Sequence, residues 1–135
     1  MASDYLETRF RTELPIDDWP IEFVIISANA TTGNTWTSDR NAAADDALRA
    51  RLEARGGWLE RVTGYSPSTG HTEPSWATVM TFDEACDLGI RFQQDAIYLV
   101  RNNELFVSYC DARRALVPVE HFTARLDPPT PSPAP

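Results

Sequence analysis

The stretch IEFVIIS, residues 21–27, decides the fold that the sequence predicts. It is a short run of apolar and β-branched side chains, which is typical of a buried strand. A buried strand needs other elements beside it and over its faces, and the rest of the chain contains patterns of both kinds. The fold class therefore follows from the order of the helical and strand-like patterns around residues 21–27.

Helical and strand-like patterns alternate after this strand. They predict a helix over 38–55, strands over 58–64 and 75–80, a second helix over 82–93, and strands over 96–100 and 105–110. The apolar stripe of the first helix consists of Ala43, Ala47, Leu48 and Leu52. Ser38 is its expected N-cap and Gly56-Gly57 ends it. The capping-box pattern T-x-x-E at Thr81–Glu84 begins the second helix, and Asn102-Asn103 favours a hairpin turn.

The order β-α-β-β-α-β, with one extra C-terminal strand, predicts an α+β fold of the ferredoxin-like, split βαβ kind. In this arrangement two helices cover one face of a mainly antiparallel sheet, and the third strand lies between the first two. We expect one domain over residues 1–126, and a disordered tail over 127–135, which holds five prolines. Residues 5–12 fit either a strand or a short helix, and residues 112–126 show no clear pattern.

The charge of the chain limits its partners. Twelve arginines and no lysine stand against twenty acidic residues, which gives a net charge of −8. This balance argues against binding to nucleic acid or to an anionic membrane surface, because both rely on basic side chains. The absence of lysine also excludes a Schiff-base nucleophile and a phosphate-binding P-loop.

Cysteine usage and the start of the chain indicate the cytoplasm. Cys86 and Cys110 fall in a predicted helix and a predicted strand, and no secretory signal pattern precedes them, so we expect reduced core thiols.

His71-Thr72-Glu73 has the H-x-E spacing of zinc deaminases, but no P-C-x-x-C follows it. Neither a metal nor a cofactor is predicted, since dinucleotide and Walker fingerprints are also missing.

Four separated pieces of the sequence resemble those of one bacterial family. They are the apolar strand ending in an asparagine at Phe23–Asn29, Asn41 followed by Leu48 and Leu52, the run Glu73-Pro74-Ser75, and Phe92–Ile97. Together they are similar to the uncharacterised DUF3293 domains over residues 23–109. The last piece resembles the family's Phe-Gly-Gln-Asn-Ala-Ile, with Gln93 in place of the glycine and Asp95 in place of the asparagine. The family has no agreed activity, so the resemblance adds a fold expectation and a set of residues.

The predicted topology brings several polar residues to the same edge of the sheet. These residues are Asn29, Arg40, Asn41, Glu73, Ser75 and Gln94. A helix N-terminus at this edge favours an anion, and Arg40 offers a forked donor to a carboxylate or phosphate. We therefore predict a site for a polar or anionic small molecule, with Glu73 as its general acid or base if the protein is an enzyme.

Two other interpretations stay open at this point. Asparagine and glutamine at element ends often satisfy backbone groups, and Glu73 has a possible ion-pair partner in Arg40, which would make the cluster purely structural. Alternatively, the acidic pairs Asp17-Asp18 and Asp45-Asp46 mark an interaction module, an inhibitor or adaptor that meets a basic protein surface. The sequence leaves open whether the protein is an enzyme, and it does not determine the oligomeric state.

Overall fold

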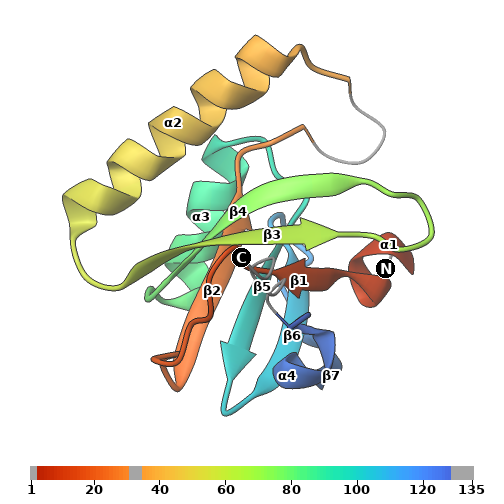
Figure 1. Cartoon of the computed structure of the whole chain (residues 1–135). Helices are drawn as coiled ribbons and strands as arrows, with labels where there is room; N and C mark the ends of the chain where they lie inside the picture. Colours follow the sequence, from red (N-terminus) through yellow and green to blue (C-terminus); the bar gives the residue numbers. More distant parts are fainter. Residues whose placement is uncertain (1–2, 31–34, 129–135) are drawn as a thin grey trace, which may run out of the picture.

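A computed structural model describes residues 3–30 and 35–128 and shows an α+β fold (Figure 1). The helices are α1 (Ser3–Glu7), α2 (Ser38–Arg55), α3 (Phe82–Arg91) and α4 (Phe122–Arg125). The strands are β1 (Arg9–Arg11), β2 (Glu22–Ser27), β3 (Leu59–Tyr65), β4 (Thr72–Thr78), β5 (Ala96–Arg101), β6 (Glu104–Tyr109) and β7 (Val117–His121). No helix in these ranges is long and apolar enough to cross a membrane.

All strands join one sheet in the order β1-β3-β4-β2-β5-β6-β7, and all paired neighbours are antiparallel. The predicted placement of the third strand is confirmed, because β4 lies between β2 and β3. Trp76 of β4 faces Ile26 of β2 on one side and Arg61 of β3 on the other. The extra strand after β5 is also confirmed and corresponds to β6.

Helices α2 and α3 cover the same face of the sheet, as the sequence predicted (Figure 1). Even-numbered residues of β2 project to this face, since side chains alternate along a strand. Leu48 and Leu52 of α2 pack there and are buried, whereas Ala43 and Ala47 are exposed. The predicted stripe was therefore too wide: the apolar contacts of α2 with this core come from the i, i+4 row of Ala44, Leu48 and Leu52.

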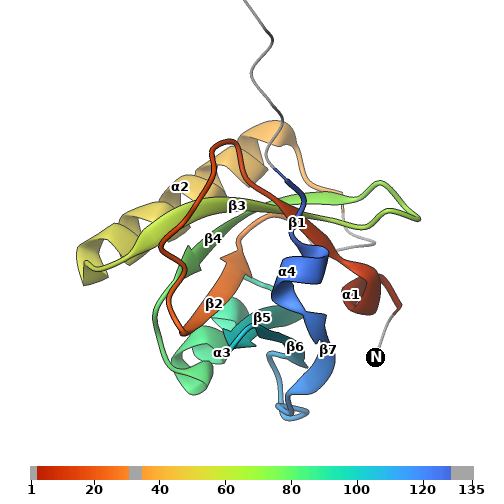
Figure 2. The ribbon, with the colours of Figure 1, turned by 60° about the horizontal axis from the view of Figure 1, so that its bottom comes forward.

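The opposite face of the sheet holds a second core. It consists of Phe10, Phe23, Ile25, Val62, Ala77, Val100, Leu105 and Phe122. The sheet curls around these side chains until the segment after α4 reaches β1, where Leu126 forms a bridge with Phe10. Figure 2 shows α4 and β7 beside β1 and α1. The unassigned residues 5–12 and 112–126 thus form both ends of the curled sheet.

Turn and cap chemistry mostly follows the sequence. Asn102 and Asn103 have φ values of 50° and 65°, as a two-residue hairpin turn of type I′ requires. The Thr81 side chain accepts a hydrogen bond from the Glu84 amide, as predicted for the start of α3. The N-cap of α2 is Thr37, one residue before the expected Ser38. Asp127, which the sequence assigned to the tail, is hydrogen-bonded to β1, and residues 129–135 lie outside the described ranges.

Candidate functional site

The predicted site residues fall into separate groups. Asn41 and Gln94 bind the backbone around Asn29, where the chain leaves β2. Glu73 and Ser75 lie on β4 and project to the face opposite the helices. They stand four and two residues before Ala77, which packs in the second core, and residues two apart on a strand point to the same face. The cavity that contains Glu73 and Ser75 is not lined by any of the other four predicted residues.

The asparagine and glutamine side chains hold the segment after β2. The Asn41 Oδ1 atom accepts a hydrogen bond from the Ala30 amide at 2.9 Å. The amide group of Gln94, which is 7% exposed, donates to the Asn29 carbonyl at 2.8 Å and to the Phe92 carbonyl at 3.1 Å. These contacts satisfy backbone groups that would otherwise be buried without partners. This geometry fits the structural interpretation of Asn41 and Gln94.

Arg40 lies elsewhere and does not pair with Glu73. Its guanidinium stacks on the Trp36 ring, with the Cζ atom 3.8 Å from the ring centroid. Glu73 instead pairs with His71, so the suggested Arg40–Glu73 ion pair is wrong. The reason is topological, because Arg40 lies at the start of α2, on the helix-covered side of the sheet.

Glu73 and Ser75 line a small cavity at the end of the β3–β4 hairpin. Its volume is about 30 Å³, which is enough for one or two water molecules or for one small polar group of a ligand. The polar lining also includes Asp4, Tyr5, Thr8, Ser66, His71 and Tyr98. The described lining holds two carboxylates and no arginine, so it suits a neutral or positively charged group better than an anion.

His71 and Glu73 form a hydrogen-bonded pair on the cavity wall. The His71 Nε2 atom is 2.9 Å from the Glu73 Oε1 atom, and the two side chains are only 29% and 24% exposed. The hydrogen bond to the carboxylate raises the pKa of His71 above its ordinary value of 6.5, although partial burial acts in the opposite direction. The pair therefore combines a proton acceptor and a proton donor in one place.

Two tyrosines close the cavity from neighbouring elements. The Tyr98 hydroxyl donates to the Thr8 Oγ1 atom at 2.7 Å, and the Tyr5 hydroxyl donates to the Asp95 carboxylate at 3.0 Å. Burial raises the pKa of both tyrosines, and the negative charge of Glu73 raises both further. Both phenols therefore stay neutral at physiological pH and can accept hydrogen bonds at their oxygen atoms, but they are poor nucleophiles.

Sequence reasoning missed most of this lining. A signal for His71 was present, because residues two apart on a strand project to the same face, and His71 stands two before Glu73. Tyr5 and Thr8 carried no signal, since their place depends on α1 and β1 reaching the edge of β3. Only the tertiary structure brings these two residues to the cavity.

Comparison with family models finds a match to the family described as Protein of unknown function (DUF3293), over residues 26–97. The match covers just over half of the chain. The protein belongs to the DUF3293 family. A comparison with curated proteins and another with solved structures find no match.

The DUF3293 segment accounts for part of the cavity. It runs from the last residues of β2 to the first residues of β5, and it therefore includes His71, Glu73 and Ser75. Tyr5, Thr8 and Tyr98 lie outside the matched residues. The acid–base pair thus belongs to the family segment, and the tyrosines that cover it come from flanking strands and helices.

Proposed function

We propose that this DUF3293 domain binds a small polar molecule at the hairpin cavity, through Glu73 and His71. The hydrogen bond between these two side chains, on a cavity wall within the family-matched segment, is the observation that supports this function. The Glu73 carboxylate accepts a hydrogen bond or a proton from the ligand, and His71 supplies a proton in return. Because the cavity is small, the ligand places one hydroxyl or amine group inside it while its remainder lies at the surface.

The lining defines the chemical class of this ligand. Asp4 and Glu73 contribute negative charge, while Ser66, Ser75 and Tyr98 contribute hydroxyl groups. An amine or a hydroxylated compound is therefore favoured over the anion that the sequence suggested. In a catalytic version of this site, Glu73 acts as the general base and His71 stabilises its ionised form.

A thermal-shift screen of a metabolite library tests the proposal with three proteins. A ligand that binds the folded state raises the melting temperature by mass action, so hits on the wild type should lose their shift in Glu73→Gln. Glu104→Gln is a matched control, because Glu104 pairs with His121 at the same 2.9 Å distance on an exposed hairpin. Shifts that survive unchanged in Glu73→Gln would count against this site.

A second candidate function is an interaction module, supported by the segment between β1 and β2. Leu14 there is 75% exposed beside Glu13, Asp17 and Asp18, around a surface hollow of about 470 Å³. Asp45 is less suited to a partner, because it already accepts hydrogen bonds from Arg61 and Trp76. The wild type should capture a partner with a basic surface, and high salt should release that partner. The double variant D17N/D18N should not capture it. Capture that persists both at high salt and in the double variant would exclude this function.

We also place the domain in a fold group and a compartment. The strand order β3-β4-β2-β5, with α2 and α3 on one face, supports a ferredoxin-like classification of the central unit. Free, buried Cys86 and Cys110 support a reducing compartment, the bacterial cytoplasm. Recovery of the native protein in a periplasmic fraction would contradict this placement.

A further inference from the structure

The arginines of this acidic chain differ in whether they form ion pairs. Within the described residues, eight of the twelve form an ion pair with a carboxylate. The remaining four are Arg11, Arg40, Arg51 and Arg91. Arg11 lies over the Tyr65 ring, whereas the other three line a groove between α2 and α3. With twenty acidic side chains available, this concentration of unpaired arginines at one place requires an explanation.

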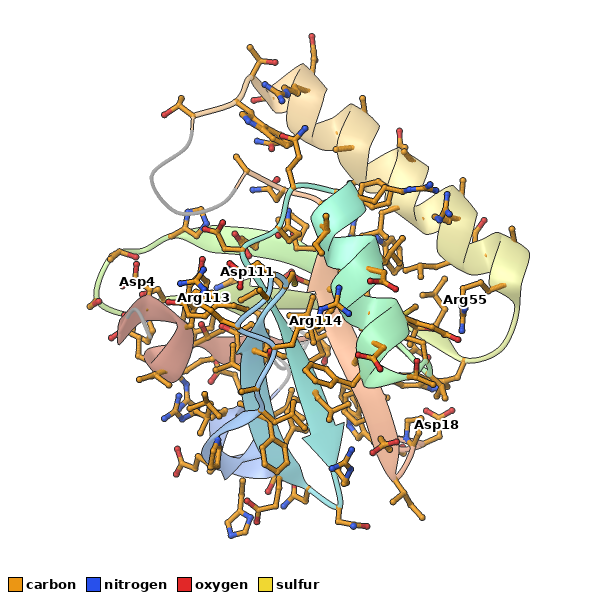
Figure 3. All side chains as sticks on the ribbon, turned by 180° about the vertical axis from the view of Figure 1, so that it is seen from behind. Asp4, Asp18, Arg55, Asp111, Arg113 and Arg114 are labelled. Carbon is orange, nitrogen blue, oxygen red and sulfur yellow. The ribbon has the colours of Figure 1, made fainter. Side chains whose placement is uncertain are left out.

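The groove consists of two adjoining hollows that share Arg91. The larger, about 340 Å³, is lined by Arg51 and Arg55 from α2 and by Met80 and Leu88. The smaller, about 180 Å³, is lined by Trp36, Arg40, Ala44 and Phe92. Figure 3 shows Arg55 at the C-terminal end of α2, beside the α3 helix. The combined space falls within the usual range of small-molecule sites.

Carboxylates at the groove are already neutralised. Glu84 pairs with Arg55 at 3.1 Å, and Asp87 pairs at 2.7 Å with Arg114, which is not part of the groove lining. Arg40, Arg51 and Arg91 therefore leave an excess of positive charge in a protein whose net charge is −8. The floor beneath these guanidinium groups is apolar, since Met80 and Leu88 are buried side chains of the core that α2 and α3 cover.

The geometry points to an anion-binding groove between α2 and α3, which takes a small molecule with two or more phosphate or carboxylate groups. Arg51 and Arg91 hold one anionic group through forked hydrogen bonds, and Arg40, oriented by its stacking on Trp36, holds another. The apolar part of the ligand packs on Met80 and Leu88. This site is separate from the cavity at Glu73, and each can fail without the other.

An NMR titration at constant ionic strength tests this groove. Inorganic pyrophosphate and citrate serve as probes, so that the two titrations distinguish phosphate from carboxylate recognition. We expect saturable shifts of the Arg51 and Arg91 side-chain Nε–Hε signals with at least one probe. The double variant R51A/R91A should bind at least about tenfold more weakly, because it loses charge-assisted hydrogen bonds.

Arg49→Ala is the matched control, because Arg49 lies on the same helix and pairs with Glu53 at 2.8 Å. Its affinity should stay within about twofold of the wild type, since its charge is already balanced. Circular dichroism should show that all variants are folded. The proposal is overturned if neither probe gives saturable shifts, or if R51A/R91A binds as well as R49A.

Discussion

Gln93, directly after the C-cap of α3, has a backbone conformation that side chains with a Cβ atom disfavour. Its φ is 58°, in the left-handed region. The Gln93 amide donates to the Ile90 carbonyl and the Gln94 amide donates to the Gly89 carbonyl, which together form a Schellman motif. The family motif that this segment resembles has glycine at this position, and the φ value explains why glycine suits it.

Gln93→Gly should therefore stabilise the protein. Relief of the left-handed strain gains about 1–2 kcal/mol, and the greater flexibility of glycine in the unfolded chain costs roughly 0.5–1 kcal/mol. We expect a net gain of about 0.5–1 kcal/mol in the free energy of unfolding, measured by urea titration. Gln93→Ala keeps the Cβ atom and should give no gain; equal stability of the two variants would contradict the strain argument.

The His71–Glu73 pair should make stability depend on pH. Because the pKa of His71 is raised on folding, its contribution is fully present below its ordinary value of 6.5 and disappears as the pH rises through the folded-state value. Glu73→Gln should lower the pKa of His71 in an NMR titration. It should also reduce the free energy of unfolding by about 0.5–1 kcal/mol at about pH 6, and by less at about pH 9. An unchanged His71 titration would show that the pair does not form in solution.

At the scale of elements, the segment after α4 holds β1 in place. Asp127 pairs with Arg9 at 2.7 Å, accepts a hydrogen bond from the Tyr65 hydroxyl, and donates its amide to the Phe10 carbonyl. β1 has only three residues and pairs with β3 along one side, so these contacts secure its other side. The closure matters for the cavity, because Thr8 directly precedes β1.

Asp127→Ala should loosen this closure. Discounted for the partial exposure of Arg9 and Asp127, the loss should be about 1 kcal/mol in the free energy of unfolding. Faster hydrogen exchange should be confined to α1 and β1. Asp18→Ala, in the exposed loop before β2, is the control and should change neither quantity.

The stabilising contribution of Asp127 should depend on pH. Burial raises the pKa of Asp127, but hydrogen bonds from Tyr65 and Arg9 outweigh burial and hold the pKa below its ordinary 3.8. Its stabilising contribution is therefore present above 3.8 and lost as the pH falls through the lower folded-state value. The difference in stability between wild type and Asp127→Ala should disappear in strong acid; a difference that persists there would mean that the Asp127 side chain stabilises β1 through contacts other than its charge.

At the scale of the whole molecule, the curl of the sheet depends on an aromatic cluster around Phe122. This side chain is 2% exposed, and its ring lies 5.1 Å from Trp19 and 5.4 Å from Phe23, measured between centroids. Phe10 is a further neighbour at 5.8 Å. The cluster joins residues from both ends of the chain to the central strand β2.

Phe122→Ala should be strongly destabilising. Truncation of a buried phenylalanine costs about 3–5 kcal/mol, a large part of the 5–15 kcal/mol that is typical of a whole domain. We expect a clear fall in the denaturation midpoint and early exchange of β1 and β7 amides. Val79→Ala, at a site that is 50% exposed, should be nearly neutral. A similarly small effect of Phe122→Ala would mean that the second core contributes little to the fold.

The sequence by itself determined the central strands, both long helices and the Asn102-Asn103 turn, because periodicity, caps and turn residues are local properties. Family membership follows from the same central segment. Only the tertiary structure decided the roles of α1, β1, β7 and α4, whose short segments gain stability from pairing and burial and not from their own patterns. The tertiary structure also separated Glu73 from Asn41 and Gln94, because residues that share an edge of a sheet can project to opposite faces. It placed Glu73 instead beside His71, in the cavity that Tyr98 also lines.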